Sequence, residues 1–236
     1  MLTFEQENDY INKAVAQMQL GYLETRLGNY EEASFMYNQA LPIMEKDEYN
    51  SNRVDLITLI GELEEYADNH TKANEQYKIA INISEEIGYD LGKGNALLHL
   101  GELKIKEKNV EEARTYFNEA MTIFKKVSHK LGEYNTHLLN ANLILRLEQN
   151  PQAALEHLQK AGAGFEAIGG REGVAEVGFY RAEACHQMQQ PEKALEQYQE
   201  ALTLSEILNI APLNVLAKET AAIIGIAGIA KQAPIA

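Results

Sequence analysis

The sequence predicts an all-α fold, an α-solenoid built from five helix–turn–helix repeats followed by a capping helix. The first observation is a phrase that recurs at intervals of 40, 40, 41 and 40 residues. Its first alanine marks the phase: Ala33, Ala73, Ala113, Ala154 and Ala194. The second observation is helical spacing of apolar and small residues after these alanines, and the third is the lack of any useful run of period-two alternation. A fixed period of helical hairpins predicts a solenoid in which each repeat packs against its neighbours.

We place the repeats within one domain that covers residues 1–236. Their expected ranges are about 10–48, 52–88, 92–128, 132–169 and 173–209. The second helix of a repeat starts after a polar residue, most clearly at Asn150-Pro151 and Gln190-Pro191, where proline suits the first helical turn. The first helix lies upstream, as in "LGKGNALLHLGELKIKEK", residues 91–108.

Glycine recurs at two places in the repeat. One set lies inside the first helix: Gly21, Gly61 and Gly101. The other set is expected in the connection between repeats: Gly92, Gly132 and Gly173. Because glycine within a helix costs roughly 1 kcal/mol against alanine, the first set predicts a close approach of a neighbouring helix.

The C-terminal segment predicts one more helix, at about residues 212–231. Its first part suits a cap on the last repeat. Its apolar part, Ala221–Ala230, is apolar all round, which a one-sided cap does not need. Two interpretations therefore stay open, a cap or an element through which copies of the chain associate.

Composition excludes several classes of function. The formal net charge of −14 and the lack of any Lys/Arg-rich stretch argue against binding nucleic acid or an anionic membrane surface. The longest apolar run is about half of what a bilayer-spanning helix needs, so we expect no membrane insertion. The single cysteine, Cys185, and an acidic start without a signal-peptide pattern favour a cytoplasmic location.

Motifs for catalysis or metal binding are absent from the sequence. It has no Walker-type phosphate loop, no HExxH helix and no paired CxxC. His129 and His137 lie eight residues apart, but Gly132 between them makes a shared helix face doubtful, and two histidines do not define a metal site. We expect no catalytic residue, no metal and no cofactor.

A known family has the same residues in the same phase. Leu20-Gly21, Ile60-Gly61 and Leu100-Gly101 are each followed, twelve residues after the glycine, by the phase alanine. An aromatic residue stands four further on (Tyr37, Tyr77, Phe117, Tyr198) and an alanine three beyond it (Ala40, Ala80, Ala120, Ala201). With this pattern the chain resembles the tetratricopeptide repeat, in its longer variant of about 40 residues. The fourth and fifth repeats depart from it with Asn142, Leu158 and Ala182.

The resemblance implies a right-handed superhelix that acts as a non-catalytic protein–protein interaction module, an adaptor or scaffold. A partner peptide or protein segment would bind in the concave groove lined by the first helices. The implied groove residues are Met18, Tyr22, Arg26, Thr58, Glu62, Glu65, Tyr66, Asn95, Leu98, Glu102, Lys106, Leu139, Leu143, Arg146, Phe179, Glu183 and His186. Their mixture of acids and apolar residues suggests a partner with basic and hydrophobic character.

Two other functions remain open from the sequence. The first is a self-assembling scaffold that forms homo-oligomers through Ala221–Ala230 or through the terminal repeats. The second is a peptide-sensing regulatory domain, which the longer repeat variant also implies. An enzyme is the least favoured class, because nothing nucleophilic or metal-binding converges.

Overall fold

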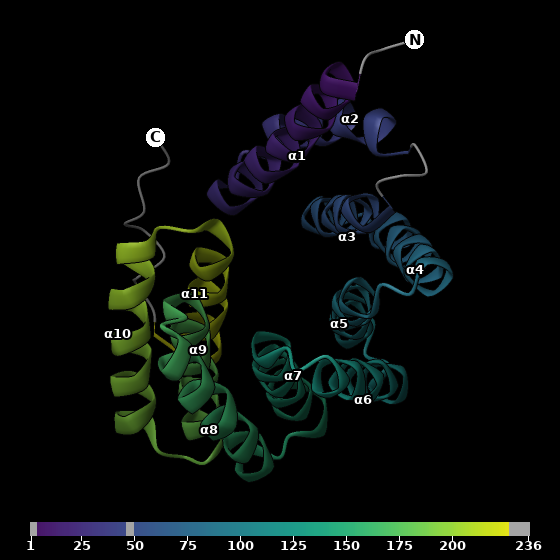
Figure 1. Cartoon of the computed structure of the whole chain (residues 1–236). Coiled ribbons are helices and arrows are strands. Elements are labelled where there is room, and N and C mark those ends of the chain that lie inside the picture. Colours follow the sequence, from purple (N-terminus) through teal and green to yellow (C-terminus); the bar gives the residue numbers. More distant parts are fainter. Residues whose placement is uncertain (1–3, 46–49, 227–236) are drawn as a thin grey trace. The chain divides into compact units, whose positions relative to one another are not determined.

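The computed structural model describes residues 4–45 and 50–226, with side chains described for residues 10–45 and 51–226. Helices account for nearly all of this part of the chain, and it contains no strand, so the predicted all-α class is confirmed. The α-helices are α1 (Phe4–Leu27), α2 (Tyr30–Met44), α3 (Asn50–Tyr66), α4 (His70–Ile87), α5 (Asp90–Lys106), α6 (Val110–Lys126), α7 (Lys130–Leu143), α8 (Pro151–Ile168), α9 (Arg171–Gln187), α10 (Pro191–Leu208) and α11 (Ala211–Ile223). A short π-helix, η2 (Ile144–Glu148), continues α7 (Figure 1).

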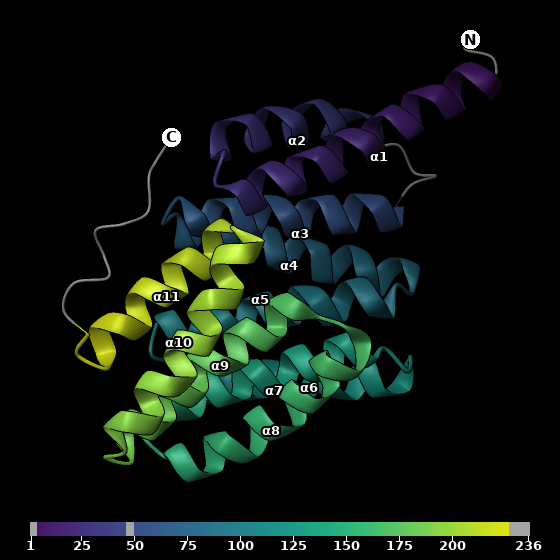
Figure 2. The ribbon, with the colours of Figure 1, turned by 90° about the vertical axis from the view of Figure 1, so that its left-hand side faces the viewer.

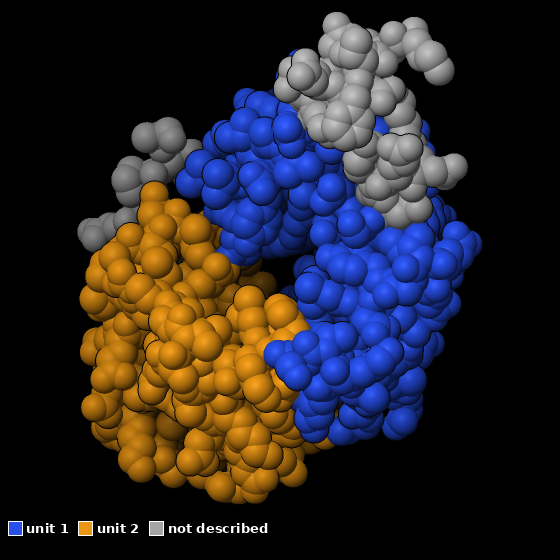
Figure 3. Space-filling view, viewed as in Figure 1, with its two compact units in different colours: residues 1–128 blue, residues 129–236 orange. Residues whose placement is uncertain are grey.

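The chain divides into two compact units, residues 1–128 and residues 129–236 (Figure 3). Unit 1 contains α1 to α6, and unit 2 contains α7 to α11 with η2. Consecutive helices pair within each unit, α1 with α2, α3 with α4 and α5 with α6 in the first, and α7 with α8 and α9 with α10 in the second (Figure 2). The predictions of a single domain and of a right-handed superhelix stay predictions.

The phase residues of the second helices form the core of each hairpin. Ala33, Tyr37 and Ala40 of α2 are all at most 1% exposed. Gly21 lies directly against the Tyr37 ring, and a Cβ at this glycine would overlap the ring. The same contact recurs between Gly61 and Tyr77 and between Gly101 and Phe117. The glycines inside the first helices therefore make room for an aromatic ring, rather than for a neighbouring backbone.

The second glycine set lies elsewhere than the sequence suggests. Gly92, Gly132 and Gly173 are buried inside the first turns of α5, α7 and α9, not in the connections. A Cβ at Gly92 would meet Tyr89 and Val54, and one at Gly173 would meet Phe165. Close packing at the start of the helix is thus the reason for glycine there.

Left-handed residues mark the turn inside every repeat. They occupy one repeat phase, with φ of 85°, 60°, 60°, 53° and 59° at Gly28, Asp68, Lys108, Gln149 and Gln189. At Lys108 the turn closes with a bond from the amide of Asn109 to the carbonyl of Lys104, 2.8 Å long, the pattern of a Schellman motif. Only the first of these turns uses glycine, so most of them carry no glycine signal in the sequence.

The C-terminal helix is shorter than expected. It ends at Ile223, where the amide of Ile226 bonds to the carbonyl of Ala221 at 3.0 Å and Gly225 has φ of 77°. The expected helix to about residue 231 and the expected apolar element Ala221–Ala230 extend into residues 227–231, which lie outside the described residues. Leu213, Ala217 and Ala221 of α11 are buried in one cluster with residues of α9 and α10.

Where residues are described, none of the helices is long and apolar enough to cross a bilayer.

Candidate functional site

Unit 1 carries an acidic face on the first helices α3 and α5. We use this name for Glu62, Glu65, Tyr66, Glu102 and Lys106. Helical spacing puts the three α3 residues on one side of their helix. Lys106 of α5 reaches across to Glu65 of α3, with Nζ 2.5 Å from Oε1. All five are among the residues that the sequence analysis expects in the concave groove, and the structure brings them together.

Tyrosine side chains hold the carboxylates of this face. The Tyr77 hydroxyl of α4 donates to Glu65 Oε2 at 2.9 Å, and the Tyr66 hydroxyl donates to Glu62 Oε1 at 3.2 Å. The Tyr66 ring stacks on Tyr30 of α2 with centroids 5.4 Å apart. These contacts fix the positions of the two glutamates.

Burial and neighbouring charges shift the pKa of two residues of the acidic face. Burial raises the pKa of Glu102, the charge of Glu65 raises it further, and Lys106 and His99 oppose the rise. Burial, the charge of Glu62 and that of Glu102 also raise the pKa of Tyr66, whereas Arg26 of α1 lowers it. Three carboxylates therefore share this region with two cations, Arg26 and Lys106. A positive group from a ligand would relieve the remaining repulsion.

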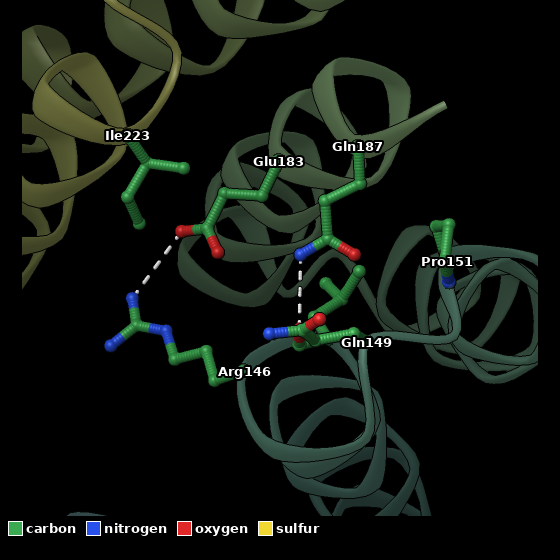
Figure 4. Close-up of a pocket in the computed structure, with 7 residues that line it drawn as sticks. Arg146, Gln149, Pro151, Glu183, Gln187 and Ile223 are labelled. Carbon is green, nitrogen blue, oxygen red and sulfur yellow. Dashed lines mark hydrogen bonds and ion pairs between the residues drawn. The ribbon is translucent and has the colours of Figure 1, made fainter. Parts of the chain in front are cut away.

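Unit 2 contains a pocket of about 450 Å³ (Figure 4). Its lining residues are Leu145, Arg146, Gln149, Pro151, Glu183, Gln187 and Ile223. The short π-helix η2 carries Arg146 into the pocket. One guanidinium nitrogen of Arg146 lies 3.3 Å from Glu183 and 3.0 Å from Glu219. Short π-helical segments often occur at functional sites.

Glu183 is the most deeply buried charge in this pocket, at 1% exposure. Its Oε1 accepts from Arg146 and, at 3.1 Å, from the Thr220 hydroxyl of α11. Burial raises the pKa of Glu183, and the arginine and the hydroxyl oppose that rise. Nearby, Gln187 Nε2 donates to the carbonyl of Leu145 at 3.0 Å. The pocket thus joins η2, α9 and α11 through hydrogen bonds.

Several predicted groove residues are not at the surface. Leu143 and Phe179 are 0% exposed, Leu98 is 6% exposed and Thr58 is 5% exposed. The Thr58 hydroxyl instead bonds to the carbonyl of Val54 at 2.9 Å. These four residues belong to the packing of the hairpins, and Glu65 of the acidic face, at 9% exposure, is itself buried, so a ligand would meet Glu62 and Glu102 first.

The remaining predicted residues differ in their surroundings. Met18 packs at the edge of the core around α1 and α2. Tyr22 is 40% exposed. Asn95 and Leu139 are half-buried, and His186 is exposed. None of these five joins the acidic face or lines the pocket.

The groove residues predicted from the sequence include none from α11, although α11 contributes to the pocket. Glu219 and Ile223 stand 40 residues after Phe179 and Glu183, so they occupy groove phases of a sixth first helix. Extending the repeat phase into the C-terminal helix would have found both residues. Gln187 stands seven residues before Ala194, as Arg26, Tyr66 and Lys106 stand before their phase alanines, so the repeat phase would have found it as well; Thr220 has no such signal.

The two histidines singled out in the sequence, His129 and His137, have separate surroundings. His129 caps α7, its Nδ1 accepting from the Gly132 amide at 3.1 Å. His137 instead lies beside His157 of α8, with their Nδ1 atoms 3.2 Å apart. Among the described residues, no three or more His, Cys, Asp or Glu side chains are grouped so as to hold a metal. Cys185 is half-buried on α9, and burial raises the pKa of its thiol.

Comparison with known families gives the identity of the repeat. Two family models described as tetratricopeptide repeat match residues 54–126 and 10–43. The chain belongs to the tetratricopeptide repeat family. A model described as cohesin loading factor also matches residues 98–225 of this tetratricopeptide repeat protein, more than half of its length. By the extent of this match the chain also belongs to the family that this model describes.

Solved structures share the tetratricopeptide repeat fold at low sequence identity. Aspartyl phosphate phosphatase F from Bacillus subtilis has a TM-score of 0.67 and 13% identity, with 92% of this chain covered. The chain spans only 57% of the length of that phosphatase. The apo form of RapI has a TM-score of 0.64 and 16% identity, covering 91% of this chain and 82% of its own.

A thermophilic tetratricopeptide repeat protein from Thermus thermophilus has a TM-score of 0.61 and 18% identity, covering 89% of this chain and 99% of its own. No curated protein sequence matches the chain significantly. At these identities the structural likeness shows the fold alone.

Proposed function

We propose that this tetratricopeptide repeat protein is a non-catalytic interaction module that binds a basic, partly hydrophobic segment of a partner protein. The acidic face of unit 1 is the observation that carries the proposal. Glu62, Glu65 and Glu102 come from two adjacent helices, and tyrosine hydroxyls hold the carboxylates of Glu62 and Glu65. Lysine or arginine from a partner forms charge-assisted hydrogen bonds with such carboxylates.

The same face offers apolar contact beside the charges. The ring of Tyr66 belongs to the acidic face, and its hydroxyl donates to the carboxylate of Glu62 at 3.2 Å. Aromatic side chains supply contact area for the apolar residues of a ligand and for the alkyl stems of lysine and arginine. A segment that alternates basic and apolar side chains suits both features.

The cellular setting is part of the proposal. A chain with one cysteine gains nothing from an oxidising compartment, because it forms no intramolecular disulfide. We place its action in the cytoplasm, on a partner protein that supplies any catalytic step.

Binding of synthetic peptides tests this function. One set of fluorescent peptides combines leucine and phenylalanine anchors with lysine and arginine, and a second set replaces the basic residues with glutamate. The wild-type chain is expected to bind the basic set, with affinity that falls as salt rises. The double variant Glu62→Gln/Glu102→Gln is expected to bind about tenfold more weakly, because two charge-assisted contacts are lost.

The matched control is Glu75→Gln, on the exposed side of α4. It removes one negative charge from the same unit without touching the acidic face, and it should leave binding unchanged. Equal binding of the acidic peptides, or an equal loss in Glu75→Gln, would show that the acidic face is not the binding site.

A further inference from the structure

Helix α1 exposes a row of apolar residues along one side. The row consists of Ala16, Leu20, Leu23 and Leu27, and we call it the α1 seam. The three leucines are 48%, 54% and 57% exposed. Their spacing of four, three and four residues is that of the a and d positions of a coiled coil, the pattern with which a helix packs against another helix.

The other repeats of unit 1 show what such residues contact. Leu20 and Leu23 have Leu100 and Leu103 as their equivalents in α5, two repeat periods later. Those two leucines are 1% and 0% exposed, because they pack in one cluster with Tyr77 of the preceding second helix α4. In the same way, Leu56 of α3 is buried with residues of α2.

The α1 seam therefore has the residues of an interior repeat interface while its side chains face solvent. The described residues packed against α1 come from α2 and α3, on its other sides. Scattered surface leucines are common, but four apolar residues in coiled-coil register are an interface pattern.

We propose that the α1 seam is a dimer interface, in which α1 packs antiparallel against α1 of a second copy of this chain. In an antiparallel pair, a positions face d positions. Leu20 then faces Leu23 of the other copy, and Leu27 faces Ala16. All four seam residues are used, and the exposed Lys13, one position further along the a series, stays outside the contact. A two-fold axis between Leu20 and Leu23 closes the contact into a dimer.

The covered C-terminal end favours this symmetric arrangement over a head-to-tail one. A head-to-tail contact would need the last second helix, α10, to accept the seam of another copy. In unit 2, however, α11 already packs against α9 and α10, with Leu213 at 0% and Ala217 at 5% exposure. The α1 seam of one copy therefore packs against the α1 seam of the other copy, rather than against α10.

Sedimentation velocity across a concentration series tests the proposal on the full chain. The wild type is expected to move from the 26.4 kDa monomer to twice that mass as concentration rises. Leu20→Gln/Leu23→Gln is expected to stay at 26.4 kDa and to unfold at the temperature of the wild type at dilutions where the wild type is monomeric, since both side chains are about half exposed. The control Leu195→Gln changes an exposed leucine on α10, and it should dimerise like the wild type. A wild type that stays monomeric at every concentration would overturn the proposal, as would an equal loss in the control.

Disulfide formation tests the direction of packing. In a Cys185→Ser background, a mixture of Leu27→Cys and Ala16→Cys chains should form a mixed disulfide dimer under mild oxidation. Leu27→Cys chains alone should remain reduced, because residue 27 of each copy lies far from its counterpart in the antiparallel arrangement. A dimer of Leu27→Cys with itself would instead establish parallel packing and overturn the antiparallel model.

Discussion

At the scale of single residues, Asp55 has a pKa that the fold raises. It lies half-buried on α3, and its Oδ2 accepts a bond from the Tyr89 hydroxyl at 3.2 Å. Burial raises the pKa of Asp55 to about 6, although the tyrosine hydroxyl lowers it. The folded protein therefore takes up a proton at a higher pH than the unfolded chain does. This residue lowers the free energy of unfolding as pH rises from about 4 to about 6.

Replacing Asp55 by asparagine should remove this pH dependence. The amide oxygen still accepts the Tyr89 hydroxyl and carries no charge to desolvate. We expect Asp55→Asn to raise the free energy of unfolding by about 2 kcal/mol near pH 8, discounted for partial exposure, and by almost nothing near pH 4. Urea unfolding at both pH values measures the difference, with exposed Glu75→Gln as the control. A gain of equal size at both pH values would mean that ionisation of Asp55 is not the cause.

At the scale of helices, the sequence identified the elements whose start and packing depend on local residue types. Proline after a polar residue marked the starts of α8 and α10, and the phase alanines marked the buried side of the second helices. The acidic face was also predictable, because helical spacing and the repeat phase put its residues together. These features need only the sequence and the geometry of a helix.

Other features depend on contacts that the sequence does not show. The fourth repeat has Asn142 where the earlier repeats have glycine, and its side-chain oxygen is buried without a hydrogen-bond partner among the described residues. Two residues later α7 changes into η2, which positions Arg146 in the pocket. Likewise, the burial of Phe179 and Leu143 depends on how far neighbouring helices cover a groove position. The position of a residue in the repeat does not by itself predict how deeply its side chain is buried.

Helix α11 provides a prediction at this scale. A chain that ends at Lys218 lacks Thr220 and Glu219, so Glu183 loses a hydroxyl donor and Arg146 loses one of its carboxylates. We expect this truncation to lower the free energy of unfolding by about 2 kcal/mol or more, because buried polar groups are left with fewer partners.

The matched control ends at Ile226 and keeps all of α11 with its closing turn. It should unfold at the same temperature as the full chain in differential scanning calorimetry. If the chain ending at Lys218 is as stable as this control, the part of α11 after Lys218 does not contribute to the cap. The masses of both chains test separately whether the C-terminal segment contributes to association.

At the scale of the whole molecule, the division into two compact units predicts which helices lose stability when a substitution destabilises one of them. A methyl group added by Gly101→Ala would overlap the Phe117 ring, and overpacking of this kind costs about 1–3 kcal/mol. Repeat proteins transmit such losses mainly to neighbouring repeats. We expect amide hydrogen exchange to accelerate in α3 to α6 of unit 1 and to stay unchanged in α9 and α10 of unit 2.

The reciprocal control is Glu183→Ala, which removes a buried acceptor from unit 2. It should accelerate exchange around α9 and α11 and leave α3 to α6 unchanged. If either variant accelerates exchange evenly along the chain, the two units unfold as one and the prediction is wrong.

The lone thiol gives the molecule a built-in reporter. Cys185 is half-buried on α9, two residues from Glu183, and burial raises its pKa, so the reactive thiolate is scarce while the fold is intact. A thiol reagent should modify it faster whenever α9 is uncovered, and the rate of labelling counts those openings directly. Opening of α9, and its suppression when a ligand in the unit 2 pocket stabilises the fold, becomes measurable on the native sequence, with no introduced dye or tag.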